Sequence, residues 1–211
     1  MRPGRFRFVS ALLLTSLFLA LVATVALAFD NPLSADAVRE AYFIATGDPG
    51  KRTAFFNKYT RHLPTPKAGP AISSIEIETP FAAVAQDIAD NSLNIHAPDA
   101  VKQFYGKPGH FRVRVEIAFT QTYPPSASTS MQLGNFWNNF HVHLSQDGEK
   151  ISSLSQDGKP IYGDQTPSGY IGATVVASYD PNKIHSGPAT VVVTGPDDAR
   201  AEASFDLNAL R

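Results

Sequence analysis

The stretch HFRVRVEIAFT, residues 110–120, decides the fold class, because its apolar and polar residues alternate strictly. One face carries only apolar residues: Phe111, Val113, Val115, Ile117 and Phe119. The other face carries polar and charged residues: His110, Arg112, Arg114 and Glu116. A period of two with one apolar face is typical of a strand in an antiparallel sheet whose other face is solvated. The stretch therefore predicts such a strand.

Similar patterns recur on both sides of this stretch. Further strands are predicted at residues 72–78, 136–144, 169–179, 189–194 and 200–207. Short strands with turn signals about every eight to twelve residues favour an antiparallel β-sandwich, of which the immunoglobulin-like arrangement is one form. The predicted class is α+β and predominantly β. The alternative is a cone-like α+β domain, in which a curved sheet wraps around helices and encloses a pocket.

A short repeat adds detail to the sheet. LSQDGEKI, residues 144–151, recurs as LSQDGKPI at residues 154–161. Each copy contains Asp-Gly, a pair that favours the tight type I′ turn of a hairpin. The repeat predicts a meander with turns at Asp147-Gly148 and at Asp157-Gly158.

Helical signals come before the strands. Ser34 is a suitable N-cap for ADAVREAYFIAT, and Asp48 followed by Pro49 starts a second helix. These signals predict a helical hairpin at about residues 35–61. Two shorter helices are expected, one after Thr79-Pro80 and one around DAVKQFYG at residues 99–106.

These elements divide the chain into consecutive segments. Residues 29–62 hold the helical hairpin, and residues 71–211 form the β-rich domain. Between them, LPTPKAGP at residues 63–70 has three prolines and a glycine, which predicts a stiff connector.

The N-terminal segment has the pattern of a secretory signal peptide. Three arginines precede an uncharged run that reaches Ala28 and ends in Ala-Leu-Ala, so cleavage before Phe29 is predicted. Residues 1–28 are accordingly assigned to the signal, and the protein is expected to be secreted or periplasmic. The apolar run is also long enough to cross a bilayer core of ~30 Å, so an uncleaved membrane anchor is the alternative.

Composition excludes several classes of function. The chain has 18 basic and 19 acidic residues, and loss of the three signal arginines leaves 15 basic residues. Such an acidic balance without a basic patch argues against a nucleic-acid partner. The absence of cysteine excludes thiol catalysis and cysteine-based metal sites.

His141 and His143 lie two residues apart in a predicted strand, so their side chains point the same way about 7 Å apart. Two such imidazoles can bind Zn²⁺ with a third ligand from a neighbouring strand. If the strand at 110–120 were that neighbour, Glu116 would supply the third ligand, although Arg114 would lie beside the cation and repel it. This hypothesis gives a metal-binding protein or a metal-dependent hydrolase; no other cofactor is predicted.

The same surface has a second interpretation without metal. A polar and aromatic binding face is predicted from six residues: Trp137, Asn139, His141, His143, Arg112 and Arg114. Trp and Arg are enriched at recognition surfaces, so the partner would be a protein or a glycan. The third interpretation is an ordinary solvated sheet face. In the cone-like alternative, Trp137 and the histidines would instead line a small-ligand pocket.

Glu76 and Glu78 share one face of the strand at 72–78. Two carboxylates about 7 Å apart are near the separation found in inverting glycosidases. Adjacent glutamates on one face are more often plain surface, and the sequence gives neither a reason for a raised pKa. The leading expectation is therefore an exported, non-catalytic binding module of the cell envelope or extracellular space.

Overall fold

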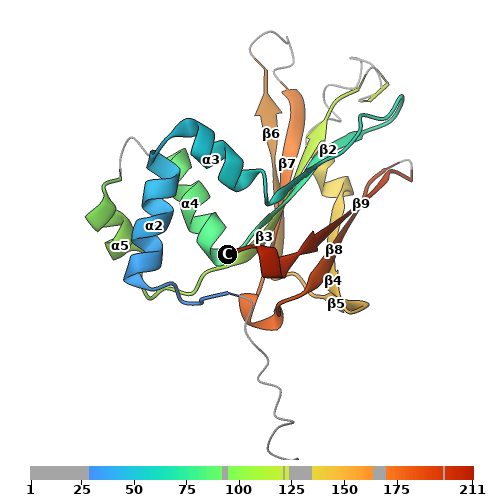
Figure 1. The fold of residues 1–211 in the computed structure, drawn as a ribbon. Coiled ribbons are helices and arrows are strands. Elements are labelled where there is room, and N and C mark those ends of the chain that lie inside the picture. The colour runs from blue at the N-terminus through green and yellow to red at the C-terminus, as the bar shows by residue number, and fades with distance from the viewer. Residues whose placement is uncertain (1–28, 92–94, 121, 124–134, 164–169, 197) are drawn as a thin grey trace, which may run out of the picture.

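The structure is a computed structural model, and it describes residues 29–91, 95–120, 122–123, 135–163, 170–196 and 198–211. The described part is mixed α+β and mostly β, with two antiparallel sheets (Figure 1). The predicted signal peptide lies outside the described residues. Among the helices that are described, none is long and apolar enough to cross a membrane.

The first sheet has five strands in the order β1-β2-β3-β7-β6. Their bounds are Thr60–His62 for β1, Ala71–Glu78 for β2, Phe111–Ala118 for β3, Tyr170–Tyr179 for β7 and Ser155–Tyr162 for β6. The second sheet has four strands in the order β5-β4-β8-β9. Their bounds are Glu149–Ile151 for β5, His141–Gln146 for β4, Pro188–Thr194 for β8 and Arg200–Asp206 for β9.

The apolar faces of both sheets contribute to one core cluster. Phe111, Val113 and Ile117 of β3 are fully buried, as the alternation in 110–120 predicts. The second sheet adds Leu144, Val191 and other inward residues to the same cluster. Tyr179 of the first sheet donates a hydrogen bond of 3.3 Å from its hydroxyl to the carbonyl of Val142 in the second.

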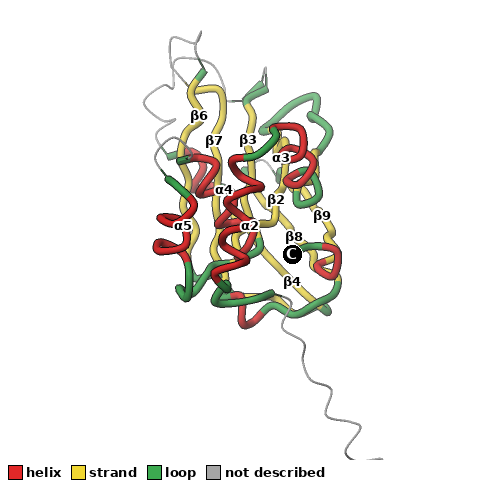
Figure 2. Tube along the Cα trace, turned by 60° about the vertical axis from the view of Figure 1, so that its left-hand side comes forward, coloured by secondary structure: helices red, strands yellow, loops and turns green. Residues whose placement is uncertain are grey.

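In the described part of the chain, four α-helices form a layer on the other face of the first sheet (Figure 2). They are α2 (Ala35–Thr46), α3 (Pro49–Phe56), α4 (Pro80–Asp90) and α5 (Ala97–Phe104). The predicted N-caps Ser34, Asp48 and Thr79 each accept a hydrogen bond from a first-turn amide. α4 contacts β2 and β3, and α2 and α5 form a second apolar cluster with it.

The predicted hairpin is confirmed as α2 and α3, but its end is wrong. α3 ends at Phe56, and Thr60–His62 form β1 against β2. Tyr59 at this junction is buried, and its carbonyl accepts a 3.0 Å hydrogen bond from the amide of Ile77. Burial of this ring and pairing with β2 outweigh the helical pattern, because tertiary contacts override weak local propensity.

The predicted strand at 136–144 is only half correct. Residues Phe136–Asn139 form a short 3₁₀ helix, η2, and the strand β4 begins at His141. Asn135 adopts a left-handed conformation with φ of 64°, which turns the chain into η2. Phe136 is buried in the core, while Trp137 is half-buried at its edge.

The repeat forms one of its two predicted turns. Asp147 and Gly148 have φ of 50° and 80° and join β4 to β5, as expected for a type I′ turn. Asp157 and Gly158 instead lie inside β6, in the other sheet. The predicted meander is therefore wrong, because the second Asp-Gly pair is used for packing: a Cβ on Gly158 would lie 2.1 Å from Cδ1 of Trp137.

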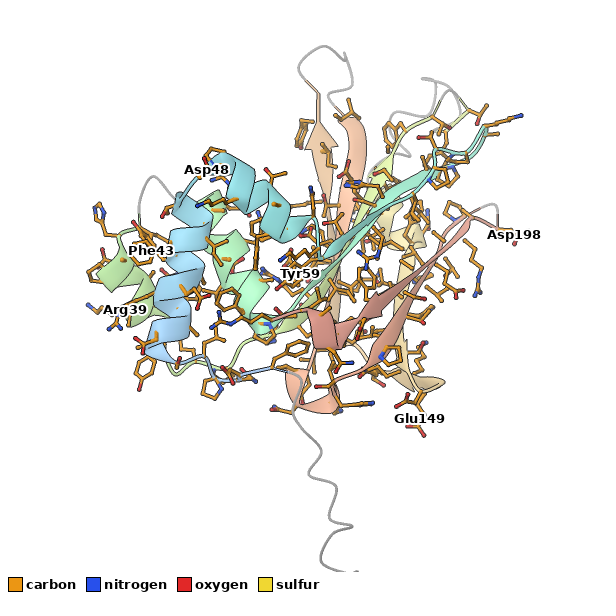
Figure 3. The ribbon with its side chains drawn as sticks, in the orientation of Figure 1. Arg39, Phe43, Asp48, Tyr59, Glu149 and Asp198 are labelled. Carbon is orange, nitrogen blue, oxygen red and sulfur yellow. The ribbon has the colours of Figure 1, made fainter. Side chains whose placement is uncertain are left out.

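Arg211 joins the helical layer to the strands. Its main-chain oxygen accepts hydrogen bonds from the hydroxyls of Tyr59 and Thr79. Its guanidinium donates to Glu40 of α2 and lies 4.6 Å from the ring centre of Phe81 in α4. Figure 3 labels Tyr59 where α3 leads into the sheet, and the C-terminal residue meets it there.

Candidate ligand-binding cleft

The structure separates the six residues of the predicted binding face. Arg112 and Arg114 lie on β3 of the first sheet, under α4. His141 and His143 lie on β4 of the second sheet, on the face opposite the buried Val142 and Leu144. The six residues therefore do not form one face, since they come from two different sheets, and ligand binding by any of them stays a prediction.

Trp137 takes yet another position. Its ring packs over Gly158, which is paired with the buried Val175 on the core side of β6. It therefore closes an edge of the core and does not share a surface with the histidines. Asn139, at the end of η2, is exposed. Within the described residues, five clefts are lined by neither Trp137, His141 nor His143, and the small-ligand pocket of the cone-like alternative stays a prediction.

The pairing assumed for the zinc hypothesis is also wrong. β3 pairs with β2 and β7, so Glu116 lies beside Ser74 and Thr174 and not beside His141. Among the described residues, no group of three or more His, Cys, Asp or Glu side chains is placed to hold a metal ion. Zinc binding by His141 and His143 with a different third ligand stays a prediction. Burial, with the nearby Lys150 and His141, lowers the pKa of His143, which favours its neutral form.

The polar face of β2 and β3 holds a row of charged side chains beneath α4. Glu78 is fully buried, and each of its carboxylate oxygens accepts one hydrogen bond. The donors are Nε of Arg112 at 2.5 Å and Nε of Arg114 at 2.7 Å. The pairing of β2 with β3 explains this arrangement, because Glu78 is the cross-strand partner of Arg112.

The row continues into α4 through Arg112. Its Nη2 donates to Oδ1 of Asp87 at 2.9 Å and to the carbonyl of Ala83 at 3.1 Å. The carboxylates Glu78 and Asp87 more than offset the effect of burial and raise the pKa of Arg112, so this side chain stays charged. A buried ion pair is stable only when its polar atoms are satisfied in this way.

Glu76 stands at the other end of the row and is bonded differently. Its carboxylate is 3.8 Å from Nε of Arg114, and it accepts no hydrogen bond from the residues that the structure describes. Its side chain is 16% exposed. Burial, and then the neighbouring charge of Glu78, raise the pKa of Glu76 to about 7. The guanidinium groups of Arg114 and Arg112 oppose this shift without cancelling it.

Glu76 lines an open polar cleft of about 530 Å³. The elements α3, β1, β2 and α4 border the cleft. Nine residues line it: Arg52, Thr53, Phe56, Asn57, Thr60, Glu76, Gln86, Ala89 and Asp90. We call it the Glu76 cleft. Its size falls within the range of small-molecule sites.

No shift in the pKa of Glu76 was expected from the sequence, whereas burial in the structure raises it to about 7. The missing information was the depth at which α4 buries the polar face. A usable signal was nevertheless present. Glutamates at 76 and 78 and arginines at 112 and 114 alternate on two predicted strands, and antiparallel pairing places opposite charges face to face.

The geometry also bears on the glycosidase hypothesis. In such a pair both carboxyl groups must reach the substrate or a water molecule. Glu78 is fully buried and occupied by two arginines, so Glu76 is the only one of the two that faces a cleft. A single carboxyl group with a pKa near 7 can bind a cation or exchange a proton near neutral pH.

Comparison of the chain with protein-family models and with curated proteins finds no match.

Proposed function

We propose that this protein is an exported, non-catalytic binding module, and that the Glu76 cleft holds its ligand. The ligand class is a small, hydroxyl-rich molecule that carries a protonated amine. One observation carries the proposal. The carboxyl group of Glu76 lines the cleft, yet it accepts no hydrogen bond from the described residues. An ammonium group would supply the missing donors.

The charges of the cleft support a cationic ligand. Asp90 adds a second carboxylate, and the single cation among the lining residues, Arg52, already donates to the carbonyl of Ala45. Ionised Glu76 therefore makes the lining net negative. Charge-assisted hydrogen bonds between an amine and a carboxylate are about twice as strong as neutral ones.

The remaining lining residues support a ligand rich in hydroxyl groups. Thr53, Asn57 and Thr60 contribute hydroxyl and amide groups on the side of α3 and β1, and Gln86 contributes an amide from α4. Thr60 is the direct cross-strand partner of Glu76. Groups of this kind orient a polar ligand and give specificity.

The decisive experiment compares glucamine, a polyhydroxylated primary amine, with sorbitol, which has a hydroxyl group in place of the amine. Calorimetric titration should show saturable binding of glucamine and much weaker binding of sorbitol. Glu76→Gln should weaken glucamine binding by about tenfold or more, because a charge-assisted contact contributes roughly 1.5–3 kcal/mol. Glu116→Gln, on the exposed part of the same sheet face, is the matched control and should bind as the unaltered protein does.

Glucamine binding should also depend on pH through Glu76. Only the ionised carboxylate attracts the amine, and its pKa is about 7. Affinity should therefore rise as the pH is raised from 5 through the pKa of about 7, and it should fall again at alkaline pH, where the amine of glucamine loses its proton. A flat profile, or equal affinity for sorbitol and glucamine, would contradict the proposal.

The export half of the proposal has its own test. The signal pattern at residues 1–28 supports secretion or periplasmic location with cleavage before Phe29. Mass spectrometry of the protein recovered outside the cytoplasm should give Phe29 as its first residue. A protein that retains Arg2 to Ala28 and stays with the membrane fraction would favour the uncleaved anchor instead.

We infer further that the two sheets stack as a β-sandwich with the helical layer on its outer side. The core cluster that both sheets share supports this arrangement. The immunoglobulin-like form stays a prediction.

A further inference from the structure

A second cleft lies beside α4, at the other end of the charged row. It has a volume of about 290 Å³ and is lined by α4, α5, the segment that leads into β3, and Leu33. Arg112 and Asp87 line it from the row, and Lys107 and His110, which are both exposed, line it as well. This cleft, the Lys107 cleft, shares none of its lining residues with the Glu76 cleft.

The Lys107 cleft carries surplus positive charge. Asp87 is already paired with Arg112 at 2.9 Å, so the opposite charges of these two side chains balance each other. Lys107 is exposed and forms no ion pair with the described residues, and the exposed His110 forms none either. Arg112 donates through Nε and Nη2, and Nη1 has no acceptor within the described part of the protein.

Several other lining residues of this cleft are apolar. Leu33 and Val84 are buried residues of the second apolar cluster, and Phe104 is half-buried against it. Pro80, at the start of α4, and Pro108 add further apolar surface. One cleft therefore combines apolar lining residues with the cationic side chains of Lys107 and Arg112. A ligand that satisfies both parts must be apolar at one end and anionic at the other.

We propose that the Lys107 cleft binds a small amphipathic carboxylate, with its apolar portion against Leu33 and Phe104 and its carboxylate at Lys107 and Arg112. This proposal does not rest on the Glu76 cleft. A carboxylate accepts up to four hydrogen bonds, so the ammonium group of Lys107 and Nη1 of Arg112 can both donate to it. Burial of a short alkyl chain adds roughly 0.8 kcal/mol for each CH₂ group.

Octanoate is the probe, with octanol and octylamine as neutral and cationic molecules that share its chain. Titration of the purified protein should show saturable binding of octanoate and weaker binding of the other two. Lys107→Gln should weaken octanoate binding by up to about fivefold, as expected for a partly exposed charge pair. Lys102→Gln, a neighbouring exposed lysine of α5 that does not line the cleft, is the matched control and should leave the affinity unchanged.

Arg112 is not altered in this test, because it belongs to the buried row and its loss would disturb the fold. His110→Gln provides a second variant of a lining residue and should give a smaller loss than Lys107→Gln. Equal binding of the three octyl compounds would overturn the proposal. So would equal affinities of Lys107→Gln and Lys102→Gln for octanoate, or no saturable binding of octanoate at all.

Discussion

Replacing Glu78 with glutamine is expected to lower the free energy of unfolding by about 3–5 kcal/mol, the usual cost of removing one partner from a buried ion pair. Glutamine has nearly the same shape, so the loss of charge is the main change. Arg112 and Arg114 would keep their charges beneath α4 without the carboxylate that both now share. Two guanidinium groups so close together would also repel each other.

Urea denaturation followed by circular dichroism measures this loss. Glu202→Gln is the matched control, because Glu202 pairs with Arg200 at 3.1 Å while both side chains are more than half exposed. Such a surface pair contributes less than about 1 kcal/mol. If both variants lost a similarly small amount of unfolding free energy, water would have to reach Glu78, contrary to its complete burial.

The second large effect is expected at Gly158. Its replacement by alanine should cost about 1–3 kcal/mol, the usual range for overpacking. The new Cβ would lie 2.1 Å from Cδ1 and 2.6 Å from Cγ of Trp137, so the whole indole must move. Trp137 is the single tryptophan of the chain, and its fluorescence should shift to longer wavelength as the ring becomes more exposed.

A double-mutant cycle separates this clash from a general effect on β6. Trp137→Ala removes the ring that Gly158→Ala would displace, so the two losses should not add. Alanine has a better strand propensity than glycine, so Gly158→Ala should be neutral or stabilising once the indole is absent. Additive losses in the double variant would show that Trp137 does not pack on Gly158.

Strand alternation predicted the sheets well. The buried and polar faces of 110–120 are the ones observed, because a period of two leaves a strand only one way to bury its apolar residues. Turn chemistry was less decisive. The same Asp-Gly pair forms a turn at 147–148 and a strand interior at 157–158, since the second glycine provides room for an indole that lies 21 positions earlier in the chain.

The site was harder to predict than the fold. The sequence shows which residues share a face of one strand, but not which strand is its neighbour. Placing 110–120 beside 136–144 joined Arg114 to His143, whereas the structure pairs Arg114 with Glu76 and Val176. In addition, α4 packs against β2 and β3, and the burial of Glu76 there raises its pKa.

The contact between Tyr59 and Arg211 has a consequence for the order in which the chain can fold. The two residues are 152 positions apart, and β7 must insert between β3 and β6 before the first sheet is complete. Such non-local pairing slows folding, typically to milliseconds or seconds. A chain that is synthesised from its N-terminus therefore cannot complete this core until β7, β8 and β9 have been made.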